Sequence, residues 1–140
     1  MLFVEGGPGF IFSNDATALI VRGRIDCSEL FSLKSFCEAD YATWNGKNAN
    51  EAFGLSRGVQ WQTTEHGAVI LSEGLSHIDR TTSNLGQPFE FFGRLAYEQQ
   101  VGATIVSLGW IHISDAKFLF GWSGNNNGEN FLTLSLGIPF

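Results

Sequence analysis

The sequence predicts an all-β fold, an antiparallel sandwich or jelly roll of about eight strands in a single domain spanning residues 1–140. Apolar residues alternate with polar ones in many short runs, and a period of two places successive side chains on opposite faces of a strand. The chain contains 17 glycines and 13 phenylalanines, a composition typical of many strands joined by tight turns. Turn-forming pairs such as Asn127-Gly128 separate the runs.

The first part of the chain is expected to contain two strands and the only helix. Residues 2–5 form the first expected strand, which residues 10–12 resume after a glycine-rich break. Residues 17–25 form the second, with Leu19, Val21 and Ile25 on one face and Arg22 and Arg24 on the other. Between residues 28 and 37, apolar side chains recur every three to four positions, which predicts one short helix.

The middle of the chain is expected to be a long polar loop followed by short strands. Residues 38–58 are predicted to form the loop, with one short strand at 41–44. Strands at 59–63 and 68–72 flank a turn at 65–67, and a further strand is expected at 75–79.

Four consecutive antiparallel strands are predicted between Pro88 and Phe140. The last two are indicated by two alternating sets, Phe118, Phe120 and Trp122, then Leu132, Leu134, Leu136, Ile138 and Phe140. Asn127-Gly128 is expected to form the tip of the hairpin between them, because Asn-Gly readily adopts positive φ angles. The leucine-rich face of the last strand is expected to pack into the protein's own core.

Charge and cysteine content exclude several classes of protein. The formal net charge of −6 argues against nucleic-acid binding, and Arg22 and Arg24 form the only close basic pair. No export signal is visible, and no apolar run is long enough for a membrane-spanning helix. Cys27 and Cys37 are therefore expected to be free thiols, held apart on the short helix in a reducing compartment.

No group of residues predicts catalysis or a bound metal or organic cofactor. The histidines lack neighbouring side chains with metal-ligand spacing: His66, His77 and His112. Ser76-His77-Asp79 has the residue types of a hydrolytic triad, but these residues are too close along one strand to form the relay. Paired carboxylates, such as Glu90 with Glu98, are predicted to face solvent. The sequence therefore predicts a protein that is not an enzyme.

Two segments resemble known families. The alternation that ends at Phe140 resembles the last strand of outer-membrane β-barrels, which implies a membrane-embedded barrel. The missing export signal and Pro139 in that strand argue against this implication. Residues 88–109 with residues 117–124 resemble the paired strands of laminin-G and concanavalin-like jelly rolls, which implies binding of carbohydrate or protein.

The uncharged C-terminal region leads to the functional hypothesis. Glu129 is the only charged residue among the final 23, so part of the sheet is expected to be covered by other subunits. We therefore expect a non-enzymatic structural component of a virus or phage particle, a capsid-decorating or surface protein, with contacts to further copies and to neighbouring structural proteins. The candidate assembly surface comprises Phe131, Thr133, Ser135 and Phe140.

The alternative is a lectin-like module that binds glycans through exposed aromatic rings. Its candidate sugar contacts are Trp44, Trp61 and Trp110. Under either hypothesis we expect no membrane insertion and no nucleic-acid partner. The expected location is the virion, or otherwise the cytoplasm.

Overall fold

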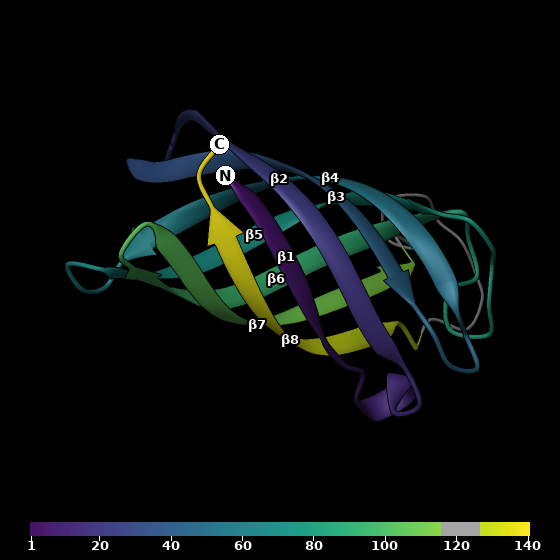
Figure 1. Cartoon of the computed structure of the whole chain (residues 1–140). Coiled ribbons are helices and arrows are strands. Elements are labelled where there is room, and N and C mark those ends of the chain that lie inside the picture. The colour runs from purple at the N-terminus through teal and green to yellow at the C-terminus, as the bar shows by residue number, and fades with distance from the viewer. Residues whose placement is uncertain (116–126) are drawn as a thin grey trace.

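A computed structural model describes residues 1–115 and 127–140, except for the side chain of Phe12. Eight antiparallel strands form a closed barrel in which each strand pairs with the next and the last pairs with the first (Figure 1). The elements are β1 (Leu2–Pro8), the 3-10 turn η1 (Ile11–Ser13), β2 (Thr17–Leu30), β3 (Leu33–Trp44), β4 (Asn50–Gln62), β5 (Gly67–Ile78), β6 (Phe89–Val101), β7 (Thr104–Asp115) and β8 (Glu129–Ile138). The expected all-β, antiparallel fold is confirmed, whereas the sandwich or jelly roll is wrong.

The barrel closes with a large stagger between its strands. A row of register partners that leaves β4 at Glu51 returns to the same strand at Trp61, ten residues further along. Between them the row passes through Thr43, Leu19, Gly6, Leu134, Leu108, Tyr97 and Val69. Such a stagger over eight strands tilts them by about 40° from the barrel axis. No edge remains, because β8 pairs with both β7 and β1.

The barrel places its apolar side chains outside and many of its polar side chains inside. On β8, Leu134 is 60% exposed whereas its neighbour Thr133 is 1% exposed. On β2, Leu19 and Val21 face outward while Arg22 is buried. The expectation that the leucine face of the last strand packs into the core is therefore wrong. A period of two separates two sets of residues correctly, but it does not say which set is inside.

A network of ion pairs fills the middle of the interior. Arg22 pairs with Glu5 and Asp40, each at 2.6 Å, and Arg24 pairs with Glu38 and Glu98, each at 2.8 Å. The guanidinium carbon of Arg24 lies 4.5 Å from the centre of the Phe3 ring and 4.2 Å from the centre of the Phe36 ring. Glu98, expected to face solvent, is thus part of the buried network, and Glu90 is buried too.

Glycines inside strands make room for these interior rings. A Cβ on Gly58 would overlap the ring of Phe36, and one on Gly137 would overlap the ring of Phe3. Neither residue has a positive φ angle. The high glycine content therefore serves interior packing as well as turns.

The expected helix at 28–37 is a β-hairpin instead. β2 continues to Leu30, β3 begins at Leu33, and these two residues are register partners. Phe31 and Ser32, with φ angles of 52° and 62°, form the two-residue turn between them. Strand pairing overrides the helix-like spacing of the apolar residues here.

The hairpin brings together the two cysteines that were expected to be free. Cys27 and Cys37 form a disulfide across β2 and β3, with their Cα atoms 5.9 Å apart. Cys37 is the register partner of Ile25, and Cys27 is the partner of Ser35, so the bridge runs diagonally between the strands. The expectation of free thiols, which was based on the missing export signal and on the helix, is therefore wrong.

The expected loop at 38–58 is also mostly strand. β3 runs on to Trp44 and β4 begins at Asn50, which leaves only residues 45–49 as a connection. The turn expected at 65–67 lies between β4 and β5, where the structure has it. The strand expected around Phe118 to Trp122 lies outside the described residues.

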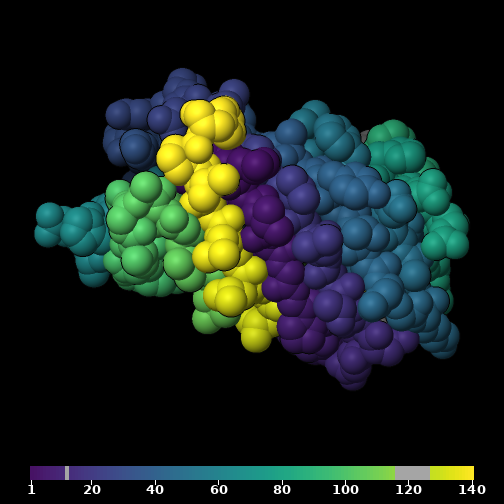
Figure 2. Space-filling model, in the orientation of Figure 1, coloured from purple at the N-terminus to yellow at the C-terminus, as the bar shows by residue number. Residues whose placement is uncertain are grey.

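Short and long connections lie at opposite ends of the barrel. The chain termini lie close together, at the end where β2–β3, β4–β5 and β6–β7 turn tightly (Figure 1). The connections at 9–16, 45–49 and 79–88 lie at the other end, which we call the loop end. Figure 2 shows β8 and β1 side by side on the surface, as their pairing requires. Among the described residues, no helix is long and apolar enough to cross a membrane.

Candidate active site on the outer wall

Three polar or aromatic side chains occupy successive outward positions near the loop end of β7. Trp110, His112 and Ser114 alternate with the buried residues Ile111, Ile113 and Asp115. The strand therefore presents an imidazole and a hydroxyl on an outer wall whose other side chains are mostly apolar. Both groups adjoin the barrel's loop end, because β7 ends at Asp115.

His112 is held in one orientation by the neighbouring strand. Its register partner on β8 is Asn130, and His112 Nδ1 lies 2.9 Å from Asn130 Oδ1. Trp110 Nε1 donates to the same oxygen at 3.2 Å, which identifies that atom as the amide carbonyl. Because that oxygen can only accept, Nδ1 of His112 donates this hydrogen bond, and in the neutral imidazole the basic nitrogen is then Nε2.

Ser114 lies beside this histidine on the same face of the same strand. Two residues along a strand span about 7 Å between Cα atoms, which a histidine side chain can bridge by leaning along the strand. A hydroxyl, an imidazole and a group that fixes the imidazole tautomer are the components of a nucleophile activated by a base. Asn serves as the fixing group in some hydrolases, so Asn130 suits that role.

An apolar groove opens next to His112. It has a volume of about 230 Å³ and lies on the outer wall across β5, β6 and β7, with Leu71, Phe91, Leu95 and Trp110 among its lining residues. Gly93 is the register partner of His112 and contributes no side chain, which leaves the groove open beside the imidazole. This shape suits an apolar chain whose reactive end lies near His112.

Buried carboxylates hold the loop end together beneath this site. Asn84 Nδ2 donates to Glu129 Oε1 at 2.9 Å, and Ser13 donates to the other oxygen of Glu129. The backbone N–H of Gly86 donates to Asp115 Oδ1 at 2.9 Å. These bonds tie two connections to the ends of β7 and β8, which carry Ser114 and Asn130.

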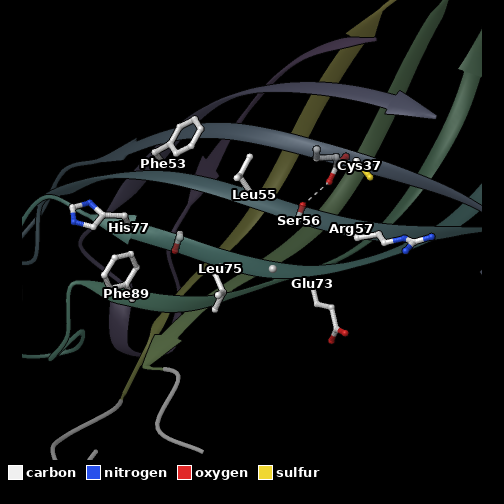
Figure 3. A pocket seen from close by; sticks show the side chains of 12 residues that line it. Cys37, Phe53, Leu55, Ser56, Arg57, Glu73, Leu75, His77 and Phe89 are labelled. Carbon is white, nitrogen blue, oxygen red and sulfur yellow. Dashed lines mark hydrogen bonds between the residues drawn. The ribbon is translucent and has the colours of Figure 1, made fainter. Parts of the chain in front are cut away.

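A larger groove lies on the outer wall across β3 to β6 (Figure 3). It has a volume of about 690 Å³ and contains His77, whose ring packs edge-on against Phe89 at 5.2 Å between ring centres. In the described part of the chain no hydrogen bond engages the His77 ring. This groove therefore lacks the oriented base that distinguishes His112.

The residues singled out from the sequence do not converge on one site. Phe131, Thr133 and Ser135 point into the barrel and cannot form a surface for a neighbouring subunit, while Phe140 is 83% exposed beyond the end of β8. Trp44 is buried and donates to the Asn48 carbonyl at 2.8 Å. Trp61 and Trp110 are exposed, but they stand on β4 and β7, three strands apart.

The sequence did not reveal the His112 site, because Asn130 lies on a different strand from His112 and Ser114. Asn130 is 18 residues from His112, and only the β7–β8 register joins them. The available signal was the alternation of Trp110, His112 and Ser114 on one face. Ser76 and His77, by contrast, point to opposite sides of the wall and form no relay. No cluster of three or more potential metal ligands occurs among the described residues, and the expected absence of a cofactor stays a prediction.

An eight-stranded antiparallel barrel with an apolar outer wall and a polar interior has the architecture of outer-membrane β-barrels. No family model matches the chain, and no curated protein matches it. One solved structure that does match is described as the crystal structure of the outer membrane enzyme PagL. It superimposes with a TM-score of 0.72 at 16% sequence identity, over 99% of each chain.

This likeness corrects the expectations about function. The fold is that of an outer-membrane barrel, so a virion structural protein and a lectin-like module are both unsupported. The expectations of no membrane insertion and of a virion or cytoplasmic location are contradicted, as is the expectation that the chain is not an enzyme. The expected assembly surface on the last strand depended on an apolar face turned inward, whereas the barrel turns that face outward.

Proposed function

We propose that this chain is an outer-membrane β-barrel enzyme that hydrolyses an acyl ester of a membrane lipid. Ser114 acts as the nucleophile, His112 as the general base and Asn130 as the group that orients His112. The observation that carries the proposal is the 2.9 Å hydrogen bond from His112 Nδ1 to Asn130 Oδ1, with Ser114 on the same outward face.

The outer wall supports the membrane location. Large apolar side chains are exposed around the whole barrel, including Leu19, Leu55, Leu71, Leu108 and Leu136. In water such a continuous apolar surface would cause aggregation, whereas in a bilayer it contacts lipid chains. Closure of the barrel also leaves no strand edge with unpaired backbone groups, as a lipid environment requires.

The site's position supports a lipid substrate. Ser114 and His112 face outward rather than into the barrel, so a substrate reaches them from the surrounding bilayer. Both lie near the loop end, at the edge of the apolar wall, where the polar head of a lipid meets its chains. The groove beside His112 is lined mainly by apolar side chains and accommodates an acyl chain.

The chemistry follows from the three side chains. Ser114 Oγ attacks the ester carbonyl carbon while its proton passes to His112 Nε2, which then donates that proton to the departing alcohol. A water molecule deprotonated by His112 cleaves the acyl-serine and releases the fatty acid. Asn130 keeps Nε2 directed toward these proton transfers through its bond to Nδ1.

The test is covalent labelling together with hydrolysis. The folded protein in detergent micelles is treated with a fluorophosphonate, and the labelled peptide is identified by mass spectrometry. We expect labelling at Ser114 and hydrolysis of a long-chain acyl ester, with both lost in Ser114→Ala and His112→Asn. His77→Asn, which changes the other outward histidine of the wall, serves as the matched control and is expected to retain both. Labelling elsewhere, or equal hydrolysis by Ser114→Ala, would contradict the proposal.

A further inference from the structure

Two opposite charges stand in the apolar wall formed by β4 and β5. Arg57 and Glu73 are register partners, and both side chains are exposed on the outside of the barrel. On the described part of the wall, they are the charged side chains that lie away from both rims. Glu51, the other outward charge on β4, is next to the strand's first residue and accepts a hydrogen bond from Tyr41 at 2.6 Å.

The two charges do not satisfy one another. Figure 3 shows the side chains of Arg57 and Glu73 directed apart, at one end of the larger groove. Arg57 uses Nη2 to donate to the Ser28 carbonyl at 3.0 Å and to Ser35 Oγ at 3.4 Å. In the described part of the chain, no hydrogen bond or ion pair engages Glu73.

An unpaired carboxylate in the middle of a lipid-facing wall is unfavourable. Ionisable groups at this depth are rare, and those that occur are paired or face a partner. Arg57 has five N–H donors, and the hydrogen bonds to Ser28 and Ser35 all leave from Nη2. The wall therefore presents one carboxylate without a donor and one guanidinium with further donors to offer.

A second copy of the same wall supplies the missing partners. A two-fold axis along the membrane normal, passing between β4 and β5, places β4 of one copy opposite β5 of the other. Register partners differ in depth by only about 3 Å for strands 4.8 Å apart and tilted by about 40°. Rotation about that axis preserves depth, so each Arg57 faces the partner's Glu73 at nearly the same level.

The surroundings of the pair suit such a contact. Phe53, Leu55, Leu75 and Phe89 line the groove of about 690 Å³ that runs from His77 toward Arg57 and Glu73 (Figure 3). Side chains of a facing copy enter this groove in place of lipid chains, and close packing is what stabilises association inside a bilayer. The ion pairs are then surrounded by apolar groups, which strengthens them.

We propose that the chain forms a two-fold dimer in the membrane through β4 and β5, with Arg57 of each copy paired to the partner's Glu73. This rests on the membrane location proposed above but not on catalysis at Ser114. The surface is unrelated to β8, whose two edges are both occupied within one barrel.

The test uses charge reversal and sedimentation in detergent micelles and in lipid nanodiscs. We expect the unaltered chain to be dimeric and Arg57→Glu or Glu73→Arg to be monomeric, because each reversal places like charges opposite one another. The double variant Arg57→Glu/Glu73→Arg restores opposite charges and is expected to dimerise again. Glu65→Arg makes the same change of charge in the β4–β5 turn and is expected to remain dimeric.

Mixing the single variants separates pairing between copies from pairing within one chain. Arg57→Glu and Glu73→Arg chains carrying different tags present complementary surfaces to each other, so we expect them to form a heterodimer recovered through either tag. If the pair acted only within one chain, mixing would restore nothing. If a charge reversal prevents folding, the milder variant Glu73→Gln takes its place in the test. We expect it to raise the dimer dissociation constant at least ten-fold.

Three outcomes would overturn the proposal: a monomeric unaltered chain, a double variant that stays monomeric, or single variants that do not associate when mixed. Labelling of Ser114 is measured on the same samples. A dimer without labelling contradicts the catalytic proposal alone, and labelling of a monomer contradicts the dimer alone.

Discussion

The guanidinium of Arg24 on β2 and the carboxylate of Glu98 on β6 form two parallel hydrogen bonds, each 2.8 Å long, across the inside of the barrel. The residues are 74 positions apart in the chain, and their strands are not neighbours in the sheet. Such a two-pronged contact exists only once the barrel has closed. It links opposite parts of the wall through the interior.

Removing one member of this pair should be strongly destabilising. Glu98→Gln leaves the buried Arg24 with Glu38 as its only ion-pair partner among the described residues. We expect a loss of about 3–5 kcal/mol in the free energy of unfolding, because the buried Arg24 loses one of the two carboxylates that compensate its charge. Urea unfolding in micelles measures this loss, and a double-mutant cycle with Arg24→Met isolates the coupling. A coupling near zero would show that the two charges are independent.

The disulfide between Cys27 and Cys37 should stabilise the β2–β3 hairpin. Replacing both cysteines by serine is expected to cost on the order of 2–3 kcal/mol, because the cross-link no longer restricts the unfolded chain. Thiol labelling of the denatured, unreduced protein should find no free thiol, and unfolding with and without reductant measures the energy. Free thiols in the purified, oxidised protein would mean that the strands do not pair as described.

Gly128 should not tolerate a side chain. Its φ angle is 69°, and a Cβ would lie 2.7 Å from His112 Cε1 and 2.9 Å from the Ile113 carbonyl oxygen. Gly128→Val is expected to cost about 1–2 kcal/mol from the backbone alone and to displace the His112 ring, which lowers hydrolysis. Gly23→Ala is the control, because nothing lies within 4 Å of its Cβ position. Equal melting temperatures for the two variants would argue against the positive φ angle.

Substitutions at adjacent positions on β8 should differ in how they respond to a change from vesicles to detergent micelles. Leu134→Arg places a charge in the lipid-facing wall and is expected to cost about 2–4 kcal/mol in vesicles. Detergent micelles adapt more easily around the charge, so the cost there should be smaller. Lysine at both Thr133 and Ser135 enters the packed interior and is expected to prevent folding in either medium. Normal folding of that double variant would show that Thr133 and Ser135 do not face the interior.

Asn130 should act on hydrolysis through the orientation of His112. Asn130→Leu removes the oxygen that accepts from Nδ1 and is expected to lower kcat about 10²–10⁴-fold, with KM little changed. Asn130→Asp keeps an acceptor at that position and is expected to retain most of the activity. If Asn130 had only a structural role, both variants would have altered melting temperatures but similar kcat values.

Much of the local structure was predictable from the sequence. Alternation along residues 17–25 and 131–138 identified strands and separated their two faces, because the period of a strand is a local property of the chain. The turn between β4 and β5 was predicted where it occurs, because Glu65-His66-Gly67 interrupts two alternating runs. The helix expected at 28–37 failed because apolar spacing in a short segment does not distinguish a helix from a hairpin until a neighbouring strand pairs with it.

The tertiary structure alone decided which face is inside and which residues meet. Alternation is unchanged when the two faces are exchanged, so the sequence of β8 is equally compatible with leucines in a core or against lipid. Closure of the barrel decides which face lies inside, because it buries Arg22, Arg24 and their acidic partners together. The ten-residue stagger that accumulates around the barrel determines which of these residues meet. The register between β7 and β8 places Asn130 beside His112, which no local pattern in either strand encodes.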